Sequence, residues 1–118
     1  MFDGQAPIYR QIADGICDDI LSGALKEDQQ VMSTNQYAAF YQINPATAAK
    51  GFALLVDEGI LHRRRGIGMF VSARARDALR ARRRERFFAE VVDPMLAEAR
   101  MIGIGVDEIV RHVTGGER

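Results

Sequence analysis

Apolar residues recur with helical spacing near the start of the chain. Over residues 7–22 they include four isoleucines at intervals of four positions: Ile8, Ile12, Ile16 and Ile20. This spacing places them on one face of an amphipathic helix. Pro7 suits the first helical position, where its missing N–H costs nothing, and Gly23 suits the left-handed residue that ends a helix. The pattern predicts a first helix across residues 7–22.

Two shorter helices are predicted next. Ser33 and Gln36 have the spacing of a capping box, in which each side chain accepts a hydrogen bond from the other residue's backbone, and the helix they open ends near Tyr41. Asn44 then suits an N-cap, and Pro45 a first helical residue in a helix that ends before Gly59. Two short helices joined by a tight turn form a helix-turn-helix, whose second helix normally enters the major groove of DNA.

The pattern changes over residues 60–72. Two runs with apolar residues flank Arg65-Gly66-Ile67-Gly68, which predicts a β-hairpin with a glycine-rich tip. A helix, a helix-turn-helix and a basic hairpin follow one another in the order of a winged helix. We therefore expect a mainly α fold with one small β-hairpin, in which residues 1–72 form a winged helix-turn-helix DNA-binding domain.

The remaining residues, 73–118, are expected to form a short helical dimerisation segment of two helices. A helical stripe of apolar residues runs from 73 to about 101, and a short helix is predicted over 106–113. Asp93-Pro94 interrupts the stripe, since proline either kinks a helix or starts a new one with Asp93 as its cap. So short a segment cannot bury the stripe alone, because an independent core takes roughly 70–80 residues.

The simplest partner for this stripe is the same segment of a second copy, in a two-fold interface. The residues expected in that interface are Leu79, Phe87, Phe88, Val91, Val92, Met95, Leu96, Ala99, Ile109 and Val113.

Charge is unevenly distributed, although the net charge is zero. Residues 1–60 carry three basic and eight acidic side chains, residues 61–86 carry ten arginines and two acidic side chains, and residues 87–118 carry three basic and six acidic ones. A positive segment between two acidic ones suggests a nucleic acid partner, while the plainer alternative is a solvated arginine-rich helix face.

Several function classes are not supported by the sequence. Cys17 is the single cysteine and lies on an apolar helix face, so we expect a buried hydrophobic role for it and no disulfide or metal site. His62 and His112 are far apart and have no carboxylate at ligand or triad spacing, and no phosphate-binding loop occurs. We expect no enzyme, no cofactor, no signal peptide and no membrane span, and hence a cytoplasmic protein.

Three separated motifs then resemble one family in order and spacing. PIYRQIADGICDDILSGAL, GFALLVDEGIL and RRRGIGMFV resemble the N-terminal winged helix of the GntR family of bacterial transcription regulators, over about residues 6–72. The segments INPATAAKGF and LAEARMIGIGVDEIV resemble the YtrA subfamily, whose short tail of two helices serves for dimerisation. The resemblance implies a dimeric regulator of nearby genes, often a transporter operon.

The candidate DNA contacts lie in three places. They are Ser33, Thr34 and Asn35 at the start of the second helix, Asn44, Ala46, Thr47 and Lys50 on the third, and Arg63, Arg64, Arg65, Gly66 and Gly68 in the wing. Guanidinium groups pair with phosphates, and threonine can bond a base or contact the thymine methyl. Asn44 is expected to act first as a cap, and Thr47 has the alternative of supporting the first turn.

The sequence departs from the family where the second helix begins. Asn35 stands where the family carries a DNA-contacting arginine, and Glu27-Asp28 stand where it carries Pro-Gly. Operator specificity should differ accordingly. The expected partners are double-stranded operator DNA and a second copy, with an unknown small-molecule effector left open. A winged helix used as a protein-interaction module, without operator binding, remains the alternative.

Overall fold

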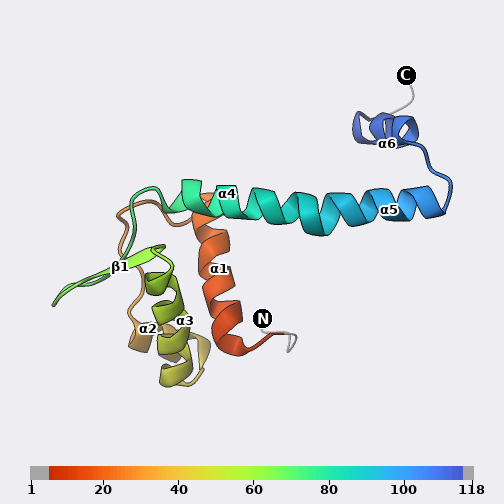
Figure 1. Ribbon diagram of the computed structural model, residues 1–118. Coiled ribbons are helices and arrows are strands. Elements are labelled where there is room, and N and C mark those ends of the chain that lie inside the picture. The colour runs from red at the N-terminus through yellow and green to blue at the C-terminus, as the bar shows by residue number, and fades with distance from the viewer. Residues whose placement is uncertain (1–5, 116–118) are drawn as a thin grey trace. The chain divides into compact units, whose positions relative to one another are not determined.

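The computed structural model describes residues 6–115, and Figure 1 shows its helices and its one hairpin. In chain order these are α1 Ile8–Ser22, α2 Thr34–Tyr41, α3 Pro45–Asp57, β1 Leu61–Arg64, β2 Gly68–Val71, α4 Ala75–Phe87, the π-helical η1 Phe88–Val92, α5 Asp93–Met101 and α6 Val106–Val113. The mainly α fold with a small β-hairpin is the one predicted. The chain divides into two compact units between Arg80 and Ala81.

Helix α1 supplies much of the first unit's core. Its buried face consists of Ile12, Ala13, Ile16, Cys17 and Ile20. Gly23 ends the helix with φ of 91°, the left-handed conformation predicted for it. Pro7 precedes the helix as its N-cap residue rather than opening it, and its carbonyl accepts from the N–H groups of Arg10 and Gln11. The expectation for Pro7 was therefore wrong by one position.

The helix-turn-helix has the predicted caps. The Ser33 hydroxyl accepts from the Gln36 N–H at 3.1 Å, and the Gln36 side chain accepts from the Ser33 N–H at 3.0 Å. The Asn44 side chain accepts from the N–H of Ala46 at 2.7 Å, and Pro45 is the first residue of α3. These bonds satisfy donors that a helix N-terminus otherwise leaves unpaired.

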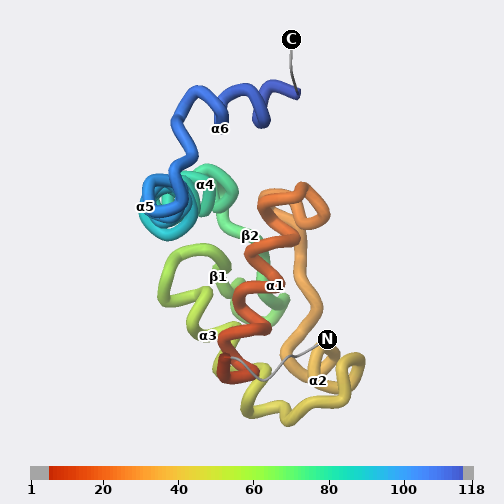
Figure 2. Tube along the Cα trace, turned by 90° about the vertical axis from the view of Figure 1, so that its right-hand side faces the viewer, coloured from red at the N-terminus to blue at the C-terminus, as the bar shows by residue number. Residues whose placement is uncertain are grey.

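Helices α1 and α3 lie side by side, as Figures 1 and 2 both show. Their approach is closest at Gly51, where an added Cβ would lie 2.8 Å from the Tyr9 carbonyl oxygen and 3.2 Å from Ile12 Cβ. Phe52, on the same helix, is 1% exposed in the core. The absence of a side chain at Gly51 therefore permits the packing of the two helices.

The hairpin has the predicted glycine-rich tip. Strands β1 and β2 are antiparallel, with Leu61 opposite Val71 and Arg64 opposite Gly68. The segment before α2 also pairs with β2, because the Val31 N–H donates to the Met69 carbonyl at 2.9 Å. Strand β2 is thus hydrogen-bonded on both edges, to β1 and to the segment before α2.

The start of α4 belongs to the first unit. The Arg74 N–H donates to a carboxylate oxygen of Glu27 at 2.8 Å, and Arg76 Nε donates to the Leu21 carbonyl at 3.1 Å. Ala75 and Leu79 are buried in the same core cluster as α1 and α3. The first compact unit therefore includes the start of α4, up to Arg80.

The second unit contains the rest of α4 with η1, α5 and α6. Pro94 neither splits the helix nor has Asp93 as a cap, because Asp93 itself has helical torsions. The chain instead widens into a π turn, in which the Asp93 N–H donates to the Phe88 carbonyl five residues earlier. Such a turn accommodates a residue that lacks an N–H and clashes with the preceding turn. No helix in residues 6–115 is both long and apolar enough to cross a membrane.

Candidate nucleic-acid interface

The first turn of α3 presents small and polar residues on its outer side. Ala46, Ala49 and Lys50 are exposed, and Thr47 is half-buried. Asn44 is committed to its cap, as predicted. The Lys50 ammonium lies 4.2 Å from the centre of the Tyr9 ring, a cation–π contact that orients the side chain while leaving its N–H donors available. The outer side of the start of α3 is therefore exposed and carries one positive charge.

The start of α2 offers fewer free groups. The Ser33 hydroxyl and backbone N–H are both used in the capping box. Thr34 is half-buried, whereas Asn35 is exposed. Asn35 is thus the residue here whose side chain is best placed to meet a ligand.

The wing arginines, predicted as one group, divide into two kinds. Arg64 donates from Nε to His62 Nε2 at 3.2 Å, its guanidinium lies 4.0 Å from the centre of the Phe70 ring, and it pairs with Asp28 at 3.6 Å. Arg63 and Arg65 are exposed and make no such contact with the described part of the chain. Arg64 therefore holds the hairpin together, and its two neighbours are available for phosphates.

The tip of the wing is fixed from the loop before α2. The Gln30 side-chain amide donates to the Ile67 carbonyl at 3.0 Å. Gly66 and Gly68 have φ of 76° and 146°, a region that residues with a Cβ rarely adopt, and a Cβ on Gly68 would lie 2.6 Å from the Gln30 amide nitrogen. Ile67 lies between them, 64% exposed at the tip.

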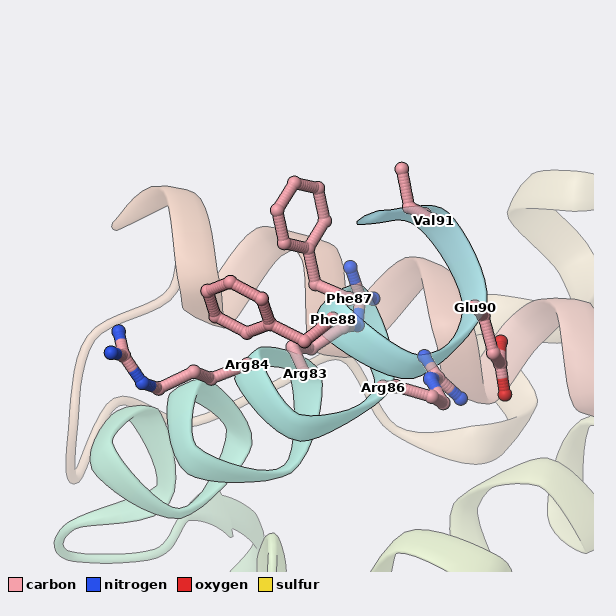
Figure 3. Close-up of a pocket in the computed structure, with 7 residues that line it drawn as sticks. All are labelled: Arg83, Arg84, Arg86, Phe87, Phe88, Glu90 and Val91. Atoms are coloured by element: carbon pink, nitrogen blue, oxygen red, sulfur yellow. The ribbon is translucent and has the colours of Figure 1, made fainter. Parts of the chain in front are cut away.

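The second unit carries an exposed apolar face beside arginines (Figure 3). Phe87, Phe88 and Val91 are 51%, 48% and 51% exposed. In Figure 3 the Phe87 and Val91 side chains point to the same side, and the Phe88 ring lies beside Phe87. The two rings meet edge to face with their centres 5.7 Å apart.

The other residues expected at the dimer interface differ in exposure. Met95 and Val113 are exposed, Val92, Leu96 and Ile109 are half-buried, and Ala99 is buried. Leu79 is 2% exposed and belongs to the core of the first unit, so its assignment to the interface is corrected. The apolar stripe continues across the boundary between the two units. Its periodicity therefore does not reveal which core covers each of its residues.

Sequence reasoning missed some residues of the interface. Gln30, Asp28 and Gly51 act through partners 36 to 42 positions away in the sequence, and a local pattern contains no signal for such contacts. Val106 and Val110 extend the exposed apolar face of α6, and their helical spacing with Val113 was the available signal.

A helix-turn-helix with a basic wing defines a winged-helix DNA-binding protein. The profile of the family described as "Bacterial regulatory proteins, gntR family" matches residues 8–71, more than half of the chain. The protein belongs to the GntR family of transcription regulators, and its relatives are regulators rather than enzymes.

Two curated relatives from Bacillus subtilis (strain 168) illustrate the match. The HTH-type transcriptional repressor NagR is 38% identical over 66 residues, which cover 56% of this chain and 27% of NagR. The chain thus matches about a quarter of NagR. The HTH-type transcriptional repressor YtrA is 27% identical over 119 residues, which cover 95% of this chain and 91% of YtrA. The YtrA match confirms the resemblance to that subfamily.

Two solved structures are also similar to this chain. A crystal structure of a putative GntR-family regulator from Bacteroides thetaiotaomicron is 34% identical, with a TM-score of 0.76, and covers 91% of this chain and 93% of that one. The DNA-binding domain of AraR, solved in complex with operator ORR3, is 26% identical with a TM-score of 0.56 and covers 61% of this chain and 87% of that one.

Proposed function

We propose that this protein is a homodimeric repressor that binds a pseudo-palindromic operator near the genes it controls, such as a transporter operon, in the bacterial cytoplasm. The observation that carries the proposal is the pair of exposed arginines, Arg63 and Arg65, on a hairpin whose own contacts are made by Arg64. Exposed arginines that make no contact within the fold, on a basic hairpin that follows a helix-turn-helix, suit a phosphate backbone.

The roles of the site residues follow from their surroundings. Arg63 and Arg65 bind phosphates, and Gly66 and Gly68 let the wing backbone approach the minor groove. Thr47 and Ala46 meet base edges in the major groove, while Lys50 and Asn35 bind phosphate or base. Ser33, Thr34 and Asn44 shape the helix ends, and Arg64 acts through the wing that it holds in place.

Dimerisation is proposed from the apolar face of the second unit. Phe87, Phe88, Val91 and Met95 expose large side chains on consecutive turns, and α6 adds Val106, Val110 and Val113. Exposed apolar patches on this scale mark interaction surfaces. A two-fold interface uses the same patch on both copies and presents two recognition helices to two half-sites.

A footprint on the DNA upstream of the protein's own gene tests the proposal. At physiological salt we expect one protected site with two half-sites about 10–10.5 base pairs, or a multiple, apart. Binding with equal affinity to this DNA and to random duplexes would favour the protein-interaction module instead. Asn35 stands where the resemblance implies a DNA-contacting arginine. This difference is the feature that favours the protein-interaction module.

A further inference from the structure

A cavity of about 230 Å³ opens at the surface of the first unit, next to the helix-turn-helix, and Asp19, Gln30 and Met32 at its rim are exposed. It is lined by α1, α2, α3 and the loop before α2 through Ile16, Asp19, Leu25, Gln29, Gln30, Val31, Met32, Tyr37, Tyr41 and Phe52. Drug-sized ligands occupy pockets of roughly 300–1,000 Å³, so this cavity suits a smaller molecule.

One wall of the cavity is aromatic. The Tyr37 and Tyr41 rings lie with their centres 4.5 Å apart and their planes at 42°, and the Phe52 ring meets Tyr37 edge to face at 5.4 Å. Tyr37 and Tyr41 are half-buried, whereas Phe52 is 1% exposed, so the two tyrosine rings supply the accessible aromatic surface. Ring faces carry the negative end of the aromatic quadrupole, which attracts cations.

The charge at the cavity is negative. Of the described residues that line it, Asp19 is the one with a charged side chain. Burial, the Tyr41 phenol and the Asp19 carboxylate, in that order, raise the pKa of Tyr37 to about 12. The Tyr37 hydroxyl therefore keeps its proton at neutral pH. The Asp19 carboxylate is close enough to interact electrostatically with Tyr37.

We propose that this cavity binds a small organic ammonium ion. The ammonium group lies against the Tyr37 and Tyr41 rings and opposite the Asp19 carboxylate, and its alkyl part contacts Leu25, Val31 and Met32. Aromatic walls with one carboxylate recognise alkylated ammonium by charge and by shape together. A neutral molecule of the same shape gains only the apolar contacts.

An occupant of this cavity is connected to both DNA-binding elements. Tyr37 and Tyr41 lie on α2, and Gln30 both lines the cavity and bonds the Ile67 carbonyl at the wing tip. A ligand that shifts Gln30 or α2 changes the geometry of the wing or of the helix-turn-helix. This regulatory step rests on the proposed repressor function, and by linkage DNA and ligand alter each other's affinity by the same factor.

Tyrosine fluorescence provides a direct test of binding. The chain has no tryptophan and three tyrosines, two of which line the cavity. Titration with choline should change the emission saturably. Two controls at equal concentration are 3,3-dimethylbutan-1-ol, the neutral isostere, and potassium chloride, and neither should produce a comparable saturable change.

Matched variants locate the site. Asp19→Asn and Tyr41→Leu should each raise the choline dissociation constant about tenfold or more by calorimetry, equivalent to about 1.4 kcal/mol. Tyr41→Phe retains the ring and should bind nearly as the parent does. Asp14→Asn removes an exposed α1 carboxylate outside the cavity and should have no effect. Thermal unfolding followed by circular dichroism verifies that each variant folds.

Three results would overturn the assignment of the cavity: no saturable response to choline, equal binding of the neutral isostere, or unchanged affinity in folded Asp19→Asn. A choline-dependent change of at least several-fold in operator affinity supports the regulatory step, and an unchanged operator affinity overturns that step alone. If no operator is bound at all, the repressor proposal fails while the choline isotherm still decides the cavity.

Discussion

Three consecutive arginines in the wing have the same chemistry and different surroundings. Arg64 is 43% exposed but contacts His62, Phe70 and Asp28, so its charge is partly neutralised and its position is set by these contacts. Arg65, next in the chain, is exposed at the turn. A substitution at each position should therefore affect different properties: the stability of the hairpin for Arg64, and the electrostatic part of DNA binding for Arg65.

The first prediction concerns Arg65→Ala. Each lost phosphate contact reduces the slope of log affinity against log salt by about 0.9, so this variant should bind every duplex more weakly and with a shallower slope. Fluorescence anisotropy across salt concentrations measures both quantities. Arg100→Ala, which removes the same charge from an exposed position on α5, should leave the slope unchanged. Equal slopes for Arg65→Ala and the parent would mean that the wing does not touch the backbone.

The second prediction concerns Thr47, half-buried on the first turn of α3. Loss of a base contact costs roughly 1–3 kcal/mol at the matched site and little on random DNA. Thr47→Ala should therefore reduce specificity more than general affinity in competition binding. Thr47→Ser keeps the hydroxyl and separates its contribution from that of the methyl group. If matched and random DNA weaken equally in Thr47→Ala, the residue positions the helix and reads no base.

At the scale of elements, α1 and α3 each contain one glycine, and the two glycines have opposite environments. A Cβ on Gly51 meets the Tyr9 carbonyl at 2.8 Å, whereas a Cβ on Gly15 of α1 has nothing within 4 Å. Both lie inside helices, where alanine is favoured over glycine by roughly 0.8–1.0 kcal/mol. The same substitution should thus have opposite signs at the two sites.

The third prediction is that Gly15→Ala stabilises the fold by about 0.5–1 kcal/mol and Gly51→Ala destabilises it by about 1–2 kcal/mol. The second value is the cost of overpacking reduced by the gain in helix propensity. Urea denaturation of both variants measures the free energies of unfolding. A Gly51→Ala variant as stable as Gly15→Ala would show that the helices separate without cost.

Most elements of the first unit could be predicted because their signals are local. The capping box at Ser33, the Asn44 cap and the glycines of the wing act within a few residues of their position in the chain. The role of Leu79 could not be predicted, since periodicity shows which face is apolar and not which core covers it. The π turn before Pro94 could not be predicted either, because a helix can accommodate a proline in more than one way.

The whole molecule combines a DNA-binding unit with a second unit that exposes its apolar residues. Within residues 81–115 the large apolar side chains of η1 and α6 are poorly buried. Phe88, Val91 and Val110 are each about half exposed. A protein of this size rarely leaves such a surface uncovered. The oligomeric state is therefore the property of the whole molecule most worth measuring.

The fourth prediction is that Phe88→Asp dissociates the dimer and weakens operator binding with it. A buried, unpaired carboxylate costs several kcal/mol at an interface and far less in solvent. Sedimentation velocity should show a monomer, with circular dichroism unchanged. Ala97→Asp adds the same charge at an exposed position of α5 that is not among the predicted interface residues, and this variant should remain dimeric. A Phe88→Asp variant that stays dimeric, or a parent that sediments as a monomer, would contradict the two-fold arrangement.

The Asp28–Arg64 pair has a consequence for how strongly the wing attracts DNA. The Asp28 carboxylate lies 3.6 Å from the Arg64 guanidinium, and both side chains are exposed. Without Arg64, its negative charge would face a polyanion uncompensated; without Asp28, Arg64 would be released toward the phosphates. Removal of either member alone should therefore change the charge that the wing presents to DNA, and in opposite directions. Removal of both together should leave that charge nearly unchanged.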